Sequence, residues 1–168
     1  MKLSEGVEAA IHCAATLAGI DGTATMPASA LAAQFGLSAS YLLKHLNALA
    51  AAGILESVPG PAGGYRLARA ANRISLLDIV LAVEGPQPAF RCGEIRRNGP
   101  VKLPASAYVK PCGNNAAMLR AEKAYRDELR RVRIADILSE LDRLDDGTIA
   151  ARSCWFRDIH ERRSGASA

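Results

Sequence analysis

Residues 26–69 decide the fold of this chain, and they read MPASALAAQFGLSASYLLKHLNALAAAGILESVPGPAGGYRLAR. Pro27 suits the start of a first helix, and the alanine-rich residues after it are strong helix formers. Gly36 permits the left-handed backbone of a tight turn, and Ser38 can cap a second helix over residues 39–52. The stretch therefore predicts two helices joined by a short turn.

A glycine-rich hairpin is predicted after the second helix. Gly53 ends that helix, residues 54–58 suit a strand, and residues 59–64 suit a tight tip before a returning strand over residues 65–67. Two helices followed by such a hairpin form a winged helix-turn-helix, which is an arrangement that reads DNA. The alternative is a helical hairpin and β-turn without a ligand, because this geometry also serves in packing and protein docking.

The second helix has an apolar face and a polar face. Leu42, Leu46 and Leu49 recur at helical spacing, which predicts that they are buried. The other face shows polar groups suited to phosphates and to base edges in a major groove. The candidate DNA-binding residues are Ser38, Ser40, Tyr41, Lys44 and His45 on the helix and Arg66 on the wing, with Asn47 a weaker candidate for base contact.

Composition limits the class of protein. The 168 residues are 49% hydrophobic, which is enough for a core, and the net charge of +4 is compatible with DNA binding without establishing it. No apolar run reaches membrane-spanning length, and the N-terminus lacks a signal pattern, so we expect a cytoplasmic protein. The four cysteines form no C-x-x-C pair, which argues against a zinc ribbon or a thioredoxin-like site.

The remaining pattern predicts a mainly α protein in which a long helix follows an irregular loop. An amphipathic helix over residues 4–18, capped by Ser4, precedes the winged motif, and Ser75 caps a further helix after it. The expected units are a winged helix-turn-helix DNA-binding domain (1–85), a cofactor-binding loop (86–112), dimerisation helices (113–145) and a C-terminal tail (146–168), whose end, residues 162–168, is expected to be frayed.

The long helix is predicted over residues 114–132. Its apolar side is made mostly of small residues, including Ala117, Ala121 and Ala124, and its other residues are heavily charged. Such a helix is too exposed for the core of a monomer and is suited to packing against its two-fold mate. A homodimer also fits the winged motif, since two recognition helices read two half-sites about one helical turn apart.

The loop of residues 86–112 and the first helix each contain a pattern that can indicate a functional site. The loop of residues 86–112 is long, irregular and rich in proline, which suggests a functional site. Glu8 and His12 lie four residues apart and share one helix face, where a surface salt bridge is the ordinary arrangement. Cys13 borders the apolar stripe and is expected to be buried, and Cys154 belongs to a small apolar patch expected to dock the tail.

Four short segments and one larger feature occur in a characteristic order along the chain. The segments are MKLS at residues 1–4, LSASYL at 37–42, GGYRLA at 63–68 and ISLLDIVLAVEG at 74–85, and a cysteine-bearing loop before a long helix follows them. Taken together, they resemble the Rrf2 family of bacterial transcription regulators, which includes an iron–sulfur cluster regulator and a nitric-oxide-sensing repressor. The resemblance covers roughly residues 1–144.

The cysteines of this chain depart from the usual family pattern. That pattern has three closely spaced cysteines in the loop, whereas only Cys92 and Cys112 occur between residues 86 and 113. The chain is similar to redox-sensing members whose 2Fe-2S cluster uses two cysteines, one histidine and one glutamate. The resemblance implies Glu8, His12, Cys92 and Cys112 as ligands, with the glutamate and histidine from one chain of a dimer and the cysteines from the other.

Two other functions stay open at this point. Cys92 and Cys112 could form a thiol–disulfide switch, or the loop could take a small ligand, with DNA binding retained. An enzyme with a cysteine nucleophile and His12 as base is the third possibility, but the sequence has no oxyanion motif, phosphate loop or paired catalytic carboxylates. We therefore expect a dimeric regulator that is not an enzyme, with double-stranded operator DNA as partner and a 2Fe-2S cluster as cofactor.

Overall fold

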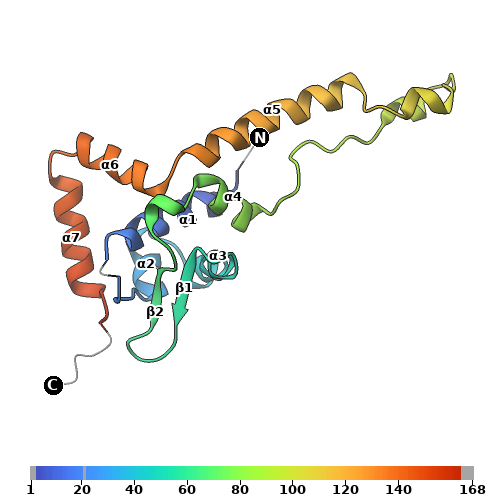
Figure 1. Ribbon diagram of the computed structural model, residues 1–168. Helices are drawn as coiled ribbons and strands as arrows, with labels where there is room; N and C mark the ends of the chain where they lie inside the picture. Colours follow the sequence, from blue (N-terminus) through green and yellow to red (C-terminus); the bar gives the residue numbers. More distant parts are fainter. Residues whose placement is uncertain (1–2, 21, 164–168) are drawn as a thin grey trace.

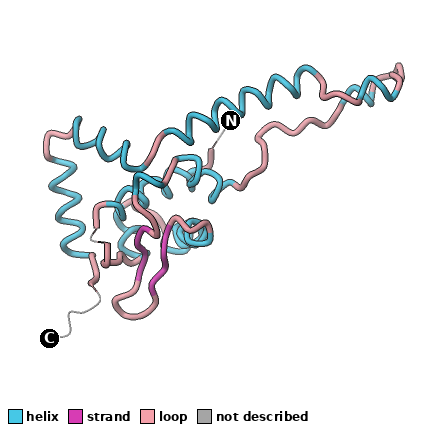
Figure 2. Tube along the Cα trace, in the orientation of Figure 1, coloured by secondary structure: helices cyan, strands magenta, loops and turns pink. Residues whose placement is uncertain are grey.

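The computed structural model describes residues 3–20 and 22–163, which form a helical head and a projecting arm (Figures 1 and 2). The mainly α class with a winged helix-turn-helix is confirmed. None of the described helices has the length and apolar character needed to cross a bilayer. The α-helices are α1 (Glu5–Ala18), α2 (Ala28–Gln34), α3 (Ala39–Ala51), α4 (Leu76–Glu84), α5 (Gly113–Arg131), α6 (Ile134–Leu144) and α7 (Thr148–His160); the strands are β1 (Leu55–Val58) and β2 (Gly64–Leu67); the 3-10 helices are η1 (Ala71–Arg73), η2 (Ile95–Asn98) and η3 (Ala105–Tyr108).

Helix α1 lies at the centre of the head. Its apolar stripe, which includes Val7, Ala10 and Leu17, is buried as predicted. The predicted capping role of Ser4 is wrong, because the Ser4 side chain makes no cap hydrogen bond with α1. Ser4 instead donates from its backbone N–H and its hydroxyl to the carboxylate of Glu84, at 2.9 and 2.5 Å. These two bonds hold the pKa of Glu84 below its ordinary value and tie α1 to the end of α4.

Local sequence chemistry forms the helix-turn-helix. Gly36 has a φ of +64°, the left-handed conformation expected at the turn. The Ser38 hydroxyl accepts a hydrogen bond from the backbone N–H of Tyr41 at 3.2 Å, which confirms Ser38 as the cap of α3. The leucines predicted for the core, Leu42, Leu46 and Leu49, are fully buried.

The wing is the antiparallel hairpin β1–β2. Leu55 lies opposite Leu67, and Val58 lies opposite Gly64. The backbone of Met26, just before α2, bonds to Tyr65 in both directions, at 2.9 and 2.8 Å. A side chain at Gly64 would collide with the Met26 backbone, so glycine permits this close approach. The wing is therefore joined to the helix-turn-helix through backbone bonds.

The arm leaves the head after α4 and returns along α5 (Figure 1). Ser75 and Asp78 form the capping box that starts α4, as the sequence predicts for Ser75. Most of the outgoing limb is loop, whereas the returning limb is helical (Figure 2). Backbone bonds at 3.0 Å join Leu76 to Val132 and Ile134 to Ile74, which anchors the end of α5 beside the start of α4.

The C-terminal tail predicted over residues 146–168 is largely a helix, α7. The carboxylates of Asp145 and Asp146 accept backbone N–H groups of its first turn, at 2.7 to 3.1 Å. Phe156 is buried in the core, while its neighbour Trp155 is 62% exposed. The expected fraying of the segment starting at residue 162 is wrong for Arg162, whose backbone pairs with Thr25. Residues 164–168, to which the prediction of a frayed end also applies, lie outside the described residues. Met1 and Lys2, the first two residues of the MKLS motif, do so as well.

Candidate functional site

The exposed face of α3 offers a set of polar side chains at its N-terminal half. Ser38, Ser40, Tyr41 and Lys44 are all exposed, as expected for groups that would meet a DNA backbone. Leu43 is exposed beside them. Because the Ser38 cap leaves the first turn of the helix well formed, the N-terminal end of α3 is presented on a rigid element.

The expected place of His45 on this exposed face is wrong. His45 is only 7% exposed, its ring packs edge-on against Tyr41, and it lies directly over Gly6 of α1. Its Nε2 is buried without a hydrogen-bond partner among the described residues. Burial, with Lys44 next to it, lowers the pKa of His45, and Glu84 partly opposes that shift. His45 is therefore a neutral packing residue between α1 and α3.

Sequence reasoning missed the contact that holds the wing on α3. The phenol of Tyr65 in β2 donates to Oδ1 of Asn47 on α3 at 2.8 Å. Asn47 thus has a structural partner, although its side chain stays exposed. The tyrosine follows directly after the two glycines of the wing, and this position could have been a signal that it reaches back to the helix.

Arg66 lies on the wing, but its guanidinium is engaged within the hairpin. It donates from Nε and Nη2 to the two carboxylate oxygens of Glu56, each at 3.0 Å, and from Nη1 to the Thr23 carbonyl at 3.3 Å. The fork raises the pKa of Arg66 and lowers that of Glu56. The pair leaves the hairpin without net charge, so Arg66 is a weaker candidate for phosphate contact than Lys44.

Glu8 and His12 lie side by side on α1 and are both exposed. They line one shallow hollow of about 400 Å³ together with Leu3 and Ile11. Within the described chain they form no salt bridge with each other, and Glu8 has no hydrogen-bond partner. The His12 ring contacts the Phe35 ring in a tilted arrangement, with an interplanar angle of 38° and ring centroids 5.3 Å apart.

The two arm cysteines lie at different places in the fold. Cys92 is exposed in the outgoing limb, and Cys112 is half-buried at the start of α5. The Sγ of Cys112 accepts the backbone N–H of Asn115 at 3.4 Å, as a helix cap does. Among residues 3–20 and 22–163, no three His, Cys, Asp or Glu side chains come together as a metal site. One chain alone therefore does not assemble the four predicted ligands.

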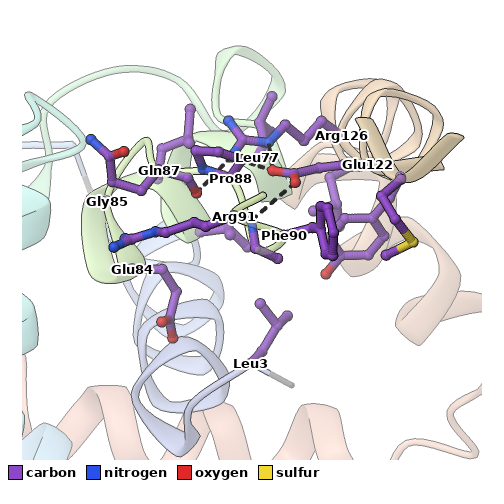
Figure 3. A pocket seen from close by; sticks show the side chains of 16 residues that line it. Leu3, Leu77, Glu84, Gly85, Gln87, Pro88, Phe90, Arg91, Glu122 and Arg126 are labelled. Carbon is purple, nitrogen blue, oxygen red and sulfur yellow. Dashed lines mark hydrogen bonds and ion pairs between the residues drawn. The ribbon is translucent and has the colours of Figure 1, made fainter. Parts of the chain in front are cut away.

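A latch that the sequence did not reveal fastens the base of the arm to α5 (Figure 3). Glu122 is only 8% exposed, and its carboxylate accepts the backbone N–H of Ala89 at 3.0 Å and Nε of Arg126 at 2.9 Å. Arg126 in turn donates to the carbonyls of Pro86 and Gln87, at 3.1 and 3.0 Å. A buried carboxylate needs such partners, so this i, i+4 pair fixes where the arm begins.

A cavity of about 580 Å³ lies next to the latch, between α4, the arm and α5. Its apolar wall includes Phe90, Tyr125 and Met118, and Figure 3 shows Phe90 and Arg91 facing the cavity with Glu84 at its rim. Arg91 has no hydrogen bond or ion pair within the described chain. The cavity could take a small molecule with an apolar body.

The other two cysteines lie apart from these groups. Cys13 is fully buried, as expected, and burial raises the pKa of its thiol from 9.0 to about 12. A thiol with such a pKa is a poor nucleophile at neutral pH, which counts against an enzyme that would use Cys13 with His12. Cys154 is exposed on α7.

Comparison with known proteins identifies the family. The Rrf2 model, described as an iron-dependent transcriptional regulator, matches residues 3–140. That span runs from α1 into α6 and leaves α7 outside it. A protein named as an HTH-type transcriptional regulator, YffB of Lactococcus lactis, is 32% identical over 140 residues, which are 83% of this chain and 88% of that protein.

Solved structures share the architecture. Staphylococcus aureus CymR, in its oxidized form, is 25% identical with a TM-score of 0.60, over 82% of this chain and 95% of that chain. T. potens IscR is 23% identical with a TM-score of 0.64, over 89% of this chain and 96% of that chain. The winged helix-turn-helix, the family match and the relative in Lactococcus agree, and the chain belongs to the Rrf2 family of DNA-binding transcriptional regulators.

Proposed function

We propose that this regulator is a homodimer that binds operator DNA through α3 and the wing, and that the redox state of a 2Fe-2S cluster sets its affinity. Glu8 and His12 of one chain and Cys92 and Cys112 of the other would hold the cluster. The observation that most supports this proposal is that Glu8 and His12 lie together, both exposed, on α1, which packs against α3. The same four ligand types occur in the redox-sensing regulator RsrR, which this sequence resembles.

The DNA-binding part of the proposal rests on α3. Ser38, Ser40, Tyr41 and Lys44 are exposed on its N-terminal half, and Lys44 makes no ion pair within the described chain. A free ammonium group on a rigid helix is suited to a phosphate contact. The paired Arg66 and the buried His45 are not needed for this surface, and we leave both out of it.

The ligand part rests on donors that are free to bind. Glu8 has no partner within the described chain, and His12 is exposed although its ring contacts Phe35. Thiolates are ordinary iron–sulfur ligands, and imidazole or carboxylate can replace them. Bound there, a 2Fe-2S cluster would supply a one-electron redox change with two unequal irons.

The shape of the arm favours ligation across two chains. Cys112 caps the end of α5 that lies farthest from the head (Figure 1). Its thiol is thus carried away from α1 of its own chain. A partner whose α5 packs against the exposed Ala117, Ala121 and Ala124 would bring a second head near that end of the arm. The dimer and the cluster are therefore parts of one proposal.

Coupling to DNA would pass through α1. Gly6, two residues before Glu8, is in contact with the buried ring of His45 on α3. A change in how Glu8 and His12 are held would move α1 against this ring and thereby displace α3.

A thiol–disulfide switch at Cys92 and Cys112 is the second candidate. Cys92 is exposed and Cys112 is half-buried at the start of α5, so both thiols are accessible to some extent. The likeness to an oxidized CymR structure also favours it. The cavity beside the latch gives the small-ligand alternative a place to act.

Protein purified without oxygen tests the cofactor. We expect a brown protein that contains iron and acid-labile sulfide in equal amounts. Cys92→Ala and Cys112→Ala should lose both, whereas Cys154→Ala, the matched variant of another exposed cysteine, should keep them. His12→Ala should weaken cluster retention, and Glu5→Ala should not, although Glu5 lines the same hollow as Glu8. Iron that depends on Cys154 but not on Cys112 would show that the ligand set is wrong.

The switch is tested separately. Oxidised and reduced protein should differ at least several-fold in operator affinity, a coupling on the order of 1 kcal/mol or more. Equal affinities in a loaded protein would reject the cluster as the switch. A colourless protein in which mass spectrometry finds a disulfide between Cys92 and Cys112 would favour the thiol candidate instead.

A further inference from the structure

The end of the described chain is fastened to the tip of the wing. The backbone of Arg162 pairs with that of Thr25 in both directions, each at 2.8 Å. Nη1 of Arg162 donates to the carbonyls of Pro61 at 2.8 Å and Gly63 at 3.4 Å. The Thr25 hydroxyl donates to the carbonyl between them, that of Ala62, at 2.8 Å. Three successive carbonyls of the tip are thus held from outside the hairpin.

The tip has little of its own to hold it. Residues 59–64 read PGPAGG, so none of its side chains can form a hydrogen bond. Gly60 has a φ of +103°, and Gly63 N–H donates to the Gly60 carbonyl at 2.8 Å. Glycine-rich loops lose much conformational entropy when they become ordered. External bonds to the three carbonyls therefore reduce the cost of ordering the tip when it binds a ligand.

Arg162 also supplies the charge that the wing lacks. The charged residues of the hairpin, Glu56 and Arg66, neutralise each other. No acidic group within the described chain forms an ion pair with Arg162, and Nε and Nη2 of its guanidinium make no hydrogen bond there. An arginine with free N–H groups at an otherwise neutral tip is suited to a phosphate oxygen.

Helix α7 brings Arg162 to this position. Phe156 anchors α7 in the core, and the helix then runs towards the loop between β1 and β2 (Figure 1). The Rrf2 match ends at residue 140, so the anchor and the arginine both belong to the part of the chain beyond it. The contact is a feature of this chain that the family match does not include.

We propose that Arg162 is part of the DNA interface: its guanidinium holds the wing tip in place and binds a phosphate of the DNA backbone. This inference rests on the proposed use of α3 and the wing as the DNA-binding surface. Its partner is the sugar-phosphate backbone of duplex DNA, so the contribution does not depend on base sequence.

The test uses a DNA duplex that the wild-type full-length protein selects from a random-sequence pool, with binding followed by fluorescence anisotropy. Arg162→Ala should weaken binding roughly tenfold and lower the salt slope by about one unit. The same variant should speed hydrogen exchange of the Gly63 and Gly64 amides. Arg152→Ala is the matched control, because Arg152 is an exposed cation on α7 without an ion pair within the described chain.

Arg162→Lys separates the two roles. It should keep the salt slope, since the charge stays, yet speed amide exchange at the tip, since an ammonium group cannot reproduce the planar guanidinium contact. Binding by Arg162→Ala equal to that of Arg152→Ala would overturn the inference, even if exchange became faster. Failure of the wild type to select any duplex would instead reject the proposed DNA-binding function.

Discussion

The contact between Gly6 and His45 shows how one residue limits another across the head. A β-carbon at position 6 would overlap the buried imidazole ring. Alanine in place of a helical glycine ordinarily stabilises by about 1 kcal/mol, whereas overpacking costs about 1–3 kcal/mol. We expect the overlap to dominate, so Gly6→Ala should lower the free energy of unfolding in denaturant titrations. The double variant with His45→Ala should recover part of the loss, and a purely additive result would contradict this.

His45 should also make stability depend on pH. Its pKa is lowered in the folded protein from the ordinary 6.5, so below that pH the unfolded chain binds a proton that the native state does not. The free energy of unfolding should therefore fall as the pH decreases through 6.5. His45→Phe keeps a ring in the site and should flatten the profile around that pH. An unchanged slope in this variant would mean that other groups are responsible.

Local spacing predicts most residues of the head correctly. The buried leucines of α3 and the caps Ser38 and Ser75 follow from periodicity and capping chemistry alone. The exposed position predicted for His45 is wrong, although the spacing does indicate burial: His45 lies three residues after Leu42 and four before Leu49, on the same helix face. Spacing alone does not show that Gly6 of α1 lies against this position of α3, where its missing side chain makes room for the ring.

At the scale of elements, the N-terminal half of α3 presents Lys44, an exposed cation without an ion pair within the described chain. Lys44→Ala should weaken binding to all duplex sequences by about the same factor and lower the salt slope by about one unit. The control is Arg66→Ala, whose effect should be smaller because the Arg66 charge is already paired with Glu56. A larger salt-slope change for Arg66→Ala than for Lys44→Ala would show that the hairpin pair opens on binding.

Helix α7 is the element that the sequence did not reveal. Among its large apolar residues only Phe156 is buried, while Ile149, Trp155 and Ile159 are exposed. This arrangement gives no clear amphipathic stripe, and the pattern therefore resembles a loose tail. Its start depends on the carboxylates of Asp145 and Asp146, and its place depends on one aromatic anchor that only the folded core defines.

At the scale of the whole molecule, the arm gives a direct test of the dimer. Ala121 and Ala124 are exposed on α5, where small side chains would let two helices approach closely. Ala121→Arg should yield monomers with poor operator affinity, as sedimentation would show. Arg120→Ala, a change at the neighbouring position, should leave the oligomeric state intact. A dimer that persists in Ala121→Arg and in Ala124→Arg would place the interface elsewhere.

The four predicted ligands are divided between two parts of the chain. Glu8 and His12 belong to the head, whereas Cys92 and Cys112 belong to the arm, and one chain does not bring three such donors together within its described part. Local spacing explains why the first two share a helix face. Periodicity predicts nothing about how the pair on α1 lies relative to the two cysteines, because that relation depends on how the arm is placed in the proposed dimer.

The latch at Glu122 and Arg126 should keep the two pieces of the protein together when the backbone is cut within the arm. Since it joins Ala89 and its neighbours to α5, the intervening residues form a closed ring with both ends secured. A protease site inserted after the exposed Lys102 would open that ring without releasing either piece. The nicked protein should elute as one particle under native conditions and as two fragments in denaturant, because α5 and the helices after it stay docked on the head.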